Sequence, residues 1–202
     1  PLLDDNEWTN PPSPMIRESI ARHMQLCLAH HPQCVANNKN TKSLPINVDD
    51  VSFVKTNPDN VGQVAMEYVS DGEHGKALEI YRVLLRNQQK QYISDLNESE
   101  IAETQSNLSV LCLLLGRTQE AMKYSQASLK AHKAASRPVQ VTLSTMELGL
   151  VLFGAQQLSK ALQAWREAFQ LACMTLGYDH FTVAVLLNNI GCLHFYMGNL
   201  AS

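Results

Sequence analysis

Four segments of this chain resemble one another at a nearly constant spacing, and this internal repeat restricts the fold more than any other feature. Equivalent positions are offset by 44, 40 and 42 residues, and the glycines Gly72, Gly116 and Gly198 follow this spacing. Apolar residues recur at helical spacing on both sides of each turn. The repeated segments are 61–84, 105–129, 145–168 and 187–202. A repeat of this length predicts helical hairpins that stack side by side.

Small and large residues occupy different positions within each unit. Alanines recur in the second helix at Ala77, Ala121 and Ala161. At these positions a larger side chain would hold two crossing helices apart. The large side chains of Tyr81 and Trp165 are expected to fill the space between neighbouring hairpins. A glycine after the first helix suits the left-handed conformation that commonly ends a helix.

The starts of the helices are also marked in the sequence. Asn57 followed by Pro58 is typical of an N-cap and the first helical residue. Asn97 with Glu100 three residues later resembles a capping box, and Asp179 is expected to cap the first helix of the last unit. These signals predict where the first helices of the units begin.

The expected organisation has three parts. Residues 1–12 form an extended N-terminal segment. Residues 13–57 are interpreted as an amphipathic helix and a long linker, either the remnant of a preceding repeat or a cap. The array at 58–202 contains three full repeats and a truncated fourth, at about 58–97, 98–136, 137–178 and 179–202.

The third unit shows the repeat pattern most fully, with Leu148-Gly149 in its first helix and Ala161-x-x-x-Trp165 in its second. This pattern resembles the tetratricopeptide repeat. The resemblance implies an all-α fold, a right-handed α-solenoid of helical hairpins. The second unit departs from the pattern, because it has Ser125 where a large aromatic residue is usual.

The period near 42 residues is longer than the usual 34 of this family. The stretches Leu176-Gly177-Tyr178-Asp179-His180 and Leu187-Asn188-Asn189-Ile190-Gly191 are similar to the kinesin-light-chain and nephrocystin subgroup of tetratricopeptide repeats. In that subgroup a Gly-x-Asp-His junction joins one unit to the next, and Leu-Asn-Asn-Leu recurs in the first helix.

In this family the first helices line a concave groove. The resemblance assigns to that groove Asn107, Asn188 and Asn189 as polar groups, because side-chain amides can bond to the backbone of an extended peptide. It also assigns six apolar or aromatic residues: Met66, Val110, Leu150, Phe153, Phe195 and Tyr196. An equally weighted interpretation is that some of these residues simply pack between consecutive first helices.

Charge and composition exclude several classes of function. The chain has 16 Lys and Arg against 19 Asp and Glu, a formal net charge of −3, and no basic block. These features exclude nucleic-acid binding by bulk charge and a polybasic attachment to membranes. The longest apolar stretch, 108–115, is far shorter than the roughly 18 residues that span a bilayer, so no membrane insertion is expected. Five cysteines without a CxxC pair favour a reducing compartment, the cytoplasm.

One cluster has the residue types of a metal site. On a helix, His23 and Cys27 share a face, His30 lies about one turn further on, and Cys34 can reach back from the following loop. Their spacing matches no standard zinc finger, and the cluster is therefore only a weak candidate. The sequence predicts no bound metal and no cofactor. It contains no pattern of a nucleophile with its base and no phosphate-binding loop, and no enzymatic activity is expected.

The expected function is that of a non-catalytic protein-interaction scaffold, which binds a peptide or a partner helix in the concave groove. The groove positions contain no lysine or arginine, unlike those of relatives that clamp the terminal carboxylate of a peptide. Two alternatives remain open. The chain is a structural subunit of a larger multiprotein assembly, or it is a helper domain of a multidomain enzyme or signalling protein.

Overall fold

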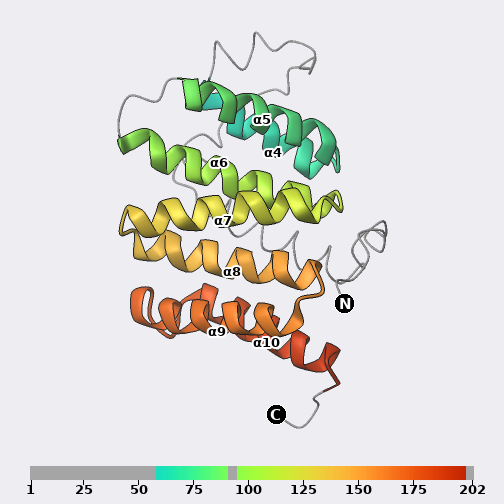
Figure 1. The fold of residues 1–202 in the computed structure, drawn as a ribbon, viewed down its shortest axis with the longest axis vertical. Coiled ribbons are helices and arrows are strands. Elements are labelled where there is room, and N and C mark those ends of the chain that lie inside the picture. Colours follow the sequence, from blue (N-terminus) through green and yellow to red (C-terminus); the bar gives the residue numbers. More distant parts are fainter. Residues whose placement is uncertain (1–57, 91–94, 199–202) are drawn as a thin grey trace, which may run out of the picture.

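The computed structural model describes residues 58–90 and 95–198, and all regular structure in these two ranges is helical. In chain order the helices are α4 (Pro58–Ser70), α5 (His74–Lys90), α6 (Asp95–Leu114), α7 (Thr118–Ala134), α8 (Pro138–Gly154), α9 (Leu158–Thr175) and α10 (Phe181–Tyr196). Antiparallel neighbours form one stack, from α4 and α5 at one end to α9 and α10 at the other (Figure 1). The expected all-α fold of stacked hairpins is confirmed.

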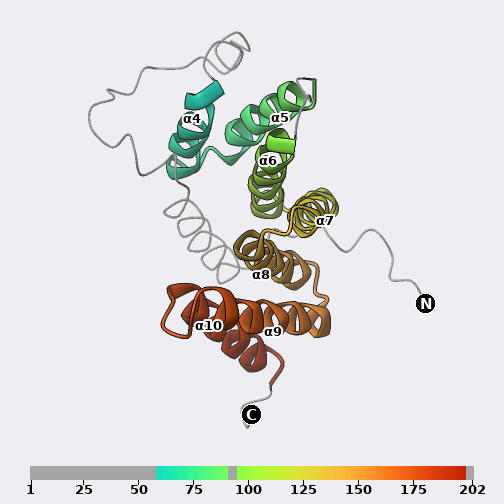
Figure 2. The ribbon, with the colours of Figure 1, turned by 90° about the vertical axis from the view of Figure 1, so that its left-hand side faces the viewer.

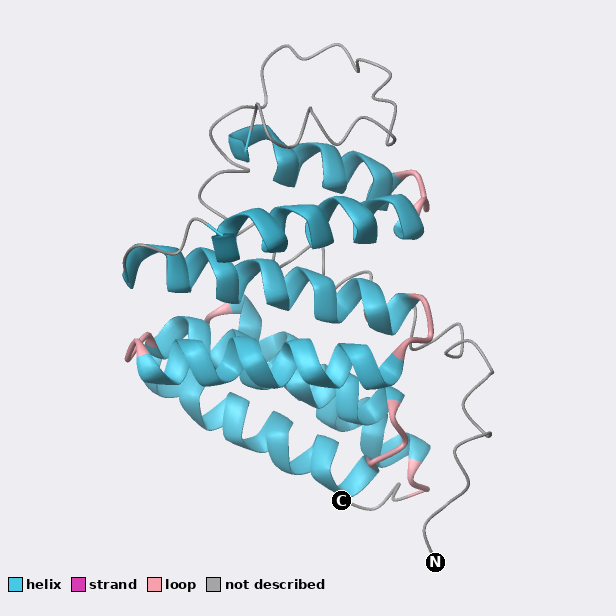
Figure 3. Ribbon diagram, turned by 45° about the horizontal axis from the view of Figure 1, so that its top comes forward, coloured by secondary structure: helices cyan, strands magenta, loops and turns pink. Residues whose placement is uncertain are grey.

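The helices of the stack form two layers. Each helix contacts the next helix along the chain, and α6 also contacts α8 directly. The first helices α4, α6, α8 and α10 therefore form one wall, while α5, α7 and α9 form the other (Figure 2). Short loops join consecutive helices (Figure 3). No described helix is both long enough and apolar enough to cross a bilayer.

The turn after each first helix requires a left-handed backbone. Gly72, Gly116 and Gly198 have φ angles of 78°, 74° and 76°, as the repeat pattern predicts. In the third hairpin the equivalent residue is Gln156, with a φ of 56°. A side chain in this conformation costs free energy, whereas glycine adopts it readily. The turn geometry is therefore conserved along the stack even where the glycine is not.

Two expected helix starts differ from the structure. Helix α6 begins at Asp95, before the second repeat expected at residue 98, and Asn97 therefore lies inside the helix rather than capping it. The N-cap of α10 is His180 rather than Asp179. Its Nδ1 accepts a hydrogen bond from the backbone N–H of Thr182 at 3.2 Å. An imidazole nitrogen thus replaces the usual carboxylate or hydroxyl oxygen of an N-cap.

The core lies where the two layers meet. Ala77, Ala121 and Ala161 have no exposed surface, in agreement with close helix crossings at these positions. The indole of Trp165 is 2% exposed and packs against α8. Its Nε1–H donates to the carbonyl oxygen of Met146 at 3.0 Å, so the polar atom of this large side chain is satisfied.

The expected N-terminal segment at 1–12 and the helix with its linker at 13–57 lie outside the described residues.

Candidate functional site

The wall of first helices is the surface on which the sequence places a binding groove. The turn residues Gly116, Gln156 and Gly198 align α6, α8 and α10 in register, with offsets of 40 and 42 residues. The same offsets relate Asn107, Glu147 and Asn189. One polar residue of each of these helices therefore occupies the same place in successive hairpins.

Glu147 is the member of this column that sequence reasoning missed. Its side chain is 2% exposed at the seam between α6 and α8, where Ser106 of α6 donates a hydrogen bond to Oε2. Within the described part of the chain, the other carboxyl oxygen, Oε1, has no hydrogen-bond partner. Burial raises the pKa of Glu147 to about 7, against the opposing effect of the Ser106 hydrogen bond. Its register with Asn107 and Asn189 was the signal that could have revealed it.

The three predicted asparagines lie in different environments. Asn107 on α6 is half-buried, and Asn189 on α10 is buried. Asn188 is exposed, because it lies on a different side of α10 from its neighbour. The structure therefore aligns Asn107 and Asn189 along the first-helix wall and places Asn188 apart from them.

The predicted apolar groove residues divide into two groups. Val110, Leu150 and Phe153 are buried within the stack. The adjacent residue Gly154 approaches Leu113 of α6 so closely that a β-carbon at Gly154 would lie 2.5 Å from Leu113 Cδ1. The interpretation that some of these residues pack between first helices describes this group. The side chain of Met66 lies outside the described residues.

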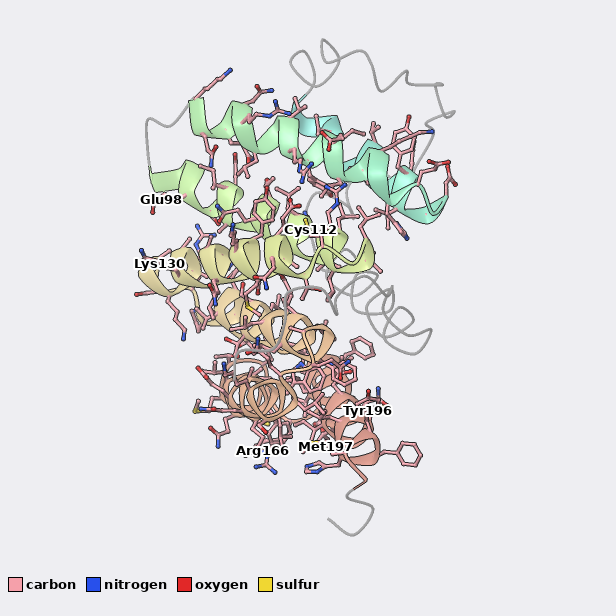
Figure 4. All side chains as sticks on the ribbon, turned by 45° about the vertical axis from the view of Figure 1, so that its right-hand side comes forward. Glu98, Cys112, Lys130, Arg166, Tyr196 and Met197 are labelled. Carbon is pink, nitrogen blue, oxygen red and sulfur yellow. The ribbon has the colours of Figure 1, made fainter. Side chains whose placement is uncertain are left out.

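The second group lies on α10 and remains exposed. Phe195 is 68% exposed, and Tyr196 is half exposed at the end of the stack (Figure 4). The ring of Tyr196 meets Phe153 edge to face, with the ring centroids 5.7 Å apart. Phe153 also contacts Trp165 of α9, again at 5.7 Å. These contacts tie α10 to the preceding hairpin through aromatic packing.

Charged residues are sorted between the two layers. Helices α4, α6, α8 and α10 contain no lysine or arginine, and their charged residues are all acidic. The basic residues of the described helices lie on α5, α7 and α9. There Arg82 pairs with Glu120 at 2.5 Å, and Lys133 pairs with Glu167 at 3.7 Å. The first-helix wall is therefore acidic, and the opposite wall carries the basic groups.

A second polar cluster lies inside the stack, between α7 and α8. His132 Nδ1 and Ser144 Oγ are 2.8 Å apart, and Ser128 Oγ lies 3.4 Å from the same hydroxyl. Burial lowers the pKa of His132, so the neutral imidazole is favoured. These groups are enclosed within the stack, and we assign them to packing.

No metal site is present among the described residues, where no three His, Cys, Asp or Glu side chains gather. The weak metal candidates His23, Cys27, His30 and Cys34 lie outside the described residues. Of the cysteines that the structure describes, Cys112 is buried and Cys192 is exposed. The exposure of Cys192 differs from the expectation that it acts as a small buried apolar residue.

Comparison with a family model assigns part of the chain. Residues 141–182 match the tetratricopeptide repeat, a range that begins in α8, includes α9 and ends in the first turn of α10. The resemblance found in the sequence is confirmed, and the model belongs to no catalytic family. Comparison with curated protein sequences finds no significant match.

Solved structures share the fold. BtubC (BKLC) from P. vanneervenii is 18% identical with a TM-score of 0.59, and the match covers 91% of this chain and 64% of BtubC. The Rap conjugation gene regulator of the plasmid pLS20, solved in complex with the Phr* peptide, is 14% identical with a TM-score of 0.63. That match covers 95% of this chain and 61% of the regulator. The chain thus spans less than two thirds of either protein.

Proposed function

We propose that this stack of tetratricopeptide-type hairpins is a non-catalytic protein-interaction module that binds a peptide along the wall of its first helices. The observation that carries the proposal is the column of polar residues, Asn107, Glu147 and Asn189, which recurs in register on α6, α8 and α10. A repeated polar position suits an extended peptide, because the peptide backbone offers donors and acceptors at regular intervals.

The fold neighbours support a peptide as the ligand. The Rap regulator has the same arrangement of helices and was solved with a peptide bound. At 14% identity this likeness concerns the fold, and the peptide class of the ligand is transferred to the present chain only as part of the proposal.

The charge of the wall favours one class of peptide over another. With acidic residues on the first helices and no basic ones, the wall has no group that could clamp a terminal carboxylate. A neutral or basic peptide avoids the repulsion that an acidic peptide would meet. The free cysteines are consistent with a reducing compartment, and we place the module in the cytoplasm.

A random library of short peptides, selected against the 202-residue chain, tests the proposal. Backbone amide shifts of the labelled protein should change along α6, α8 and α10 when a selected peptide is added. Asn107→Ala removes one amide and should weaken binding about fivefold, the value of one hydrogen bond near 1 kcal/mol. Gln126→Ala, an exposed amide on α7, is the matched control. Shifts confined to α5, α7 and α9, or selection of acidic peptides, would contradict the proposal.

A further inference from the structure

Helix α10 has an uncovered face outside the polar column. Its exposed residues include Phe181, Ala184, Leu187, Gly191 and Phe195, which recur at three- and four-residue spacing along one side of the helix. Leu187 is 54% exposed and Phe195 is 68% exposed. Most of the large exposed apolar side chains in the described residues lie on α10 or on the segment that leads into it.

The same face of α8 is covered. With the offset of 42 residues, Ala184, Leu187 and Phe195 correspond to Thr142, Thr145 and Phe153 of α8. Those three residues are buried, in contrast to their exposed equivalents on α10. The cover on α8 is helix α9, which contacts Phe153 through Trp165 and Thr142 through Thr175.

The two equivalent glycines show what kind of side chain this face accepts. A β-carbon built on Gly149 of α8 would lie 2.3 Å from the indole of Trp165, so the ring occupies the space left by the missing side chain. A β-carbon built on Gly191 of α10 would meet no atom within 4 Å. Gly191 therefore leaves open on α10 the space that a tryptophan fills on α8.

The chemistry of α10 favours an apolar partner. The helix contains no Asp, Glu, Lys or Arg, and its exposed side is lined by aromatic, aliphatic and small residues. No charged residue of α10 has to be desolvated when another helix covers this face. The uncovered face thus continues, on the next hairpin, the interface that joins α8 to α9.

We infer that α10 is a docking site for an amphipathic helix of a partner protein, which packs on α10 as α9 packs on α8. The partner helix carries a small residue and, four residues later, a large aromatic residue, as α9 does with Ala161 and Trp165. The aromatic ring enters the space over Gly191, and the polar side of the partner helix faces solvent. This site is distinct from the peptide wall and does not depend on it.

The sequence of α9 itself serves as the probe. A fluorescent peptide of residues 158–175 is titrated with the 202-residue chain, and binding is followed by fluorescence anisotropy. The same peptide with Trp165→Ala is the control ligand. On the protein, Gly191→Leu fills the open space, and Gly75→Leu places the same side chain at an exposed glycine of α5 whose surroundings are also open. Circular dichroism checks that both variants keep their helicity.

We expect the α9 peptide to bind with a Kd below about 1 mM. Loss of its tryptophan and the Gly191→Leu variant should each weaken binding about tenfold or more, while Gly75→Leu should leave it unchanged. Failure of the α9 peptide to bind, or equal binding to the Gly191→Leu and wild-type chains, would overturn the inference. Light scattering supplies a further check: a dimer that Gly191→Leu dissociates would show that a second copy of the chain occupies the face, which would also overturn it.

Discussion

Replacing Glu147 by glutamine exchanges an ionisable carboxyl for a neutral amide at the seam between α6 and α8. The glutamine oxygen can still accept the hydrogen bond from Ser106, and the two side chains have nearly the same shape. The substitution therefore removes the capacity to ionise with little change in packing. Burial raises the pKa of this carboxyl from 4.5 to about 7 in the folded chain.

The expected magnitude follows from that pKa difference. Each pKa unit corresponds to about 1.36 kcal/mol, so ionisation of Glu147 at high pH destabilises the fold by about 3 kcal/mol. Below pH 4.5 the carboxyl is protonated in both states and this cost is absent. Between pH 4.5 and 7 the unfolded chain releases its proton while the folded chain retains it, and the free energy of unfolding falls as the pH rises.

Urea unfolding at pH 5 and at pH 8, followed by circular dichroism, measures this difference. Glu147→Gln should be more stable than the wild-type chain at pH 8 by about 3 kcal/mol, and by about 1 kcal/mol at pH 5. Burial lowers the pKa of His132, whose contribution therefore opposes folding at low pH, but it is common to both proteins and cancels in their difference. Glu100→Gln, an exposed carboxyl on α6, is the matched control. A difference that does not grow between pH 5 and pH 8 would refute the argument.

Two further predictions concern residues that the repeat makes equivalent or chemically alike. Gly149→Ala should lower the free energy of unfolding by about 1–3 kcal/mol, because its methyl group would overlap the indole of Trp165, whereas Gly191→Ala should raise it by about 0.5–1 kcal/mol through helix propensity; equal effects in urea unfolding would contradict the packing difference. Cys192 should be alkylated by iodoacetamide in the native chain, while Cys112, whose pKa burial raises to about 11, should react only after unfolding, as peptide mass mapping would show; rapid native labelling of Cys112 would contradict its burial.

The sequence alone determined the hairpin architecture, because its evidence is local and repeated. Gly72 and Gly116 mark left-handed turns, and Ala121 and Ala161 mark close crossings, so each unit carries the same instructions for two helices and a turn. Repetition makes such signals reliable, since a chance match at one unit does not recur at the next. The family resemblance of the third unit rests on the same local pattern.

Only the tertiary structure decided which side of each helix faces another helix and which faces solvent. Leu150 and Phe195 belong to the same apolar pattern, yet one is buried and the other is exposed, because burial depends on whether a neighbouring helix lies over that face. Glu147 similarly reads as an ordinary surface carboxylate until α6 covers it. A residue's own helix sets its direction, but its environment and pKa are set by segments about forty residues away, which local sequence patterns do not record.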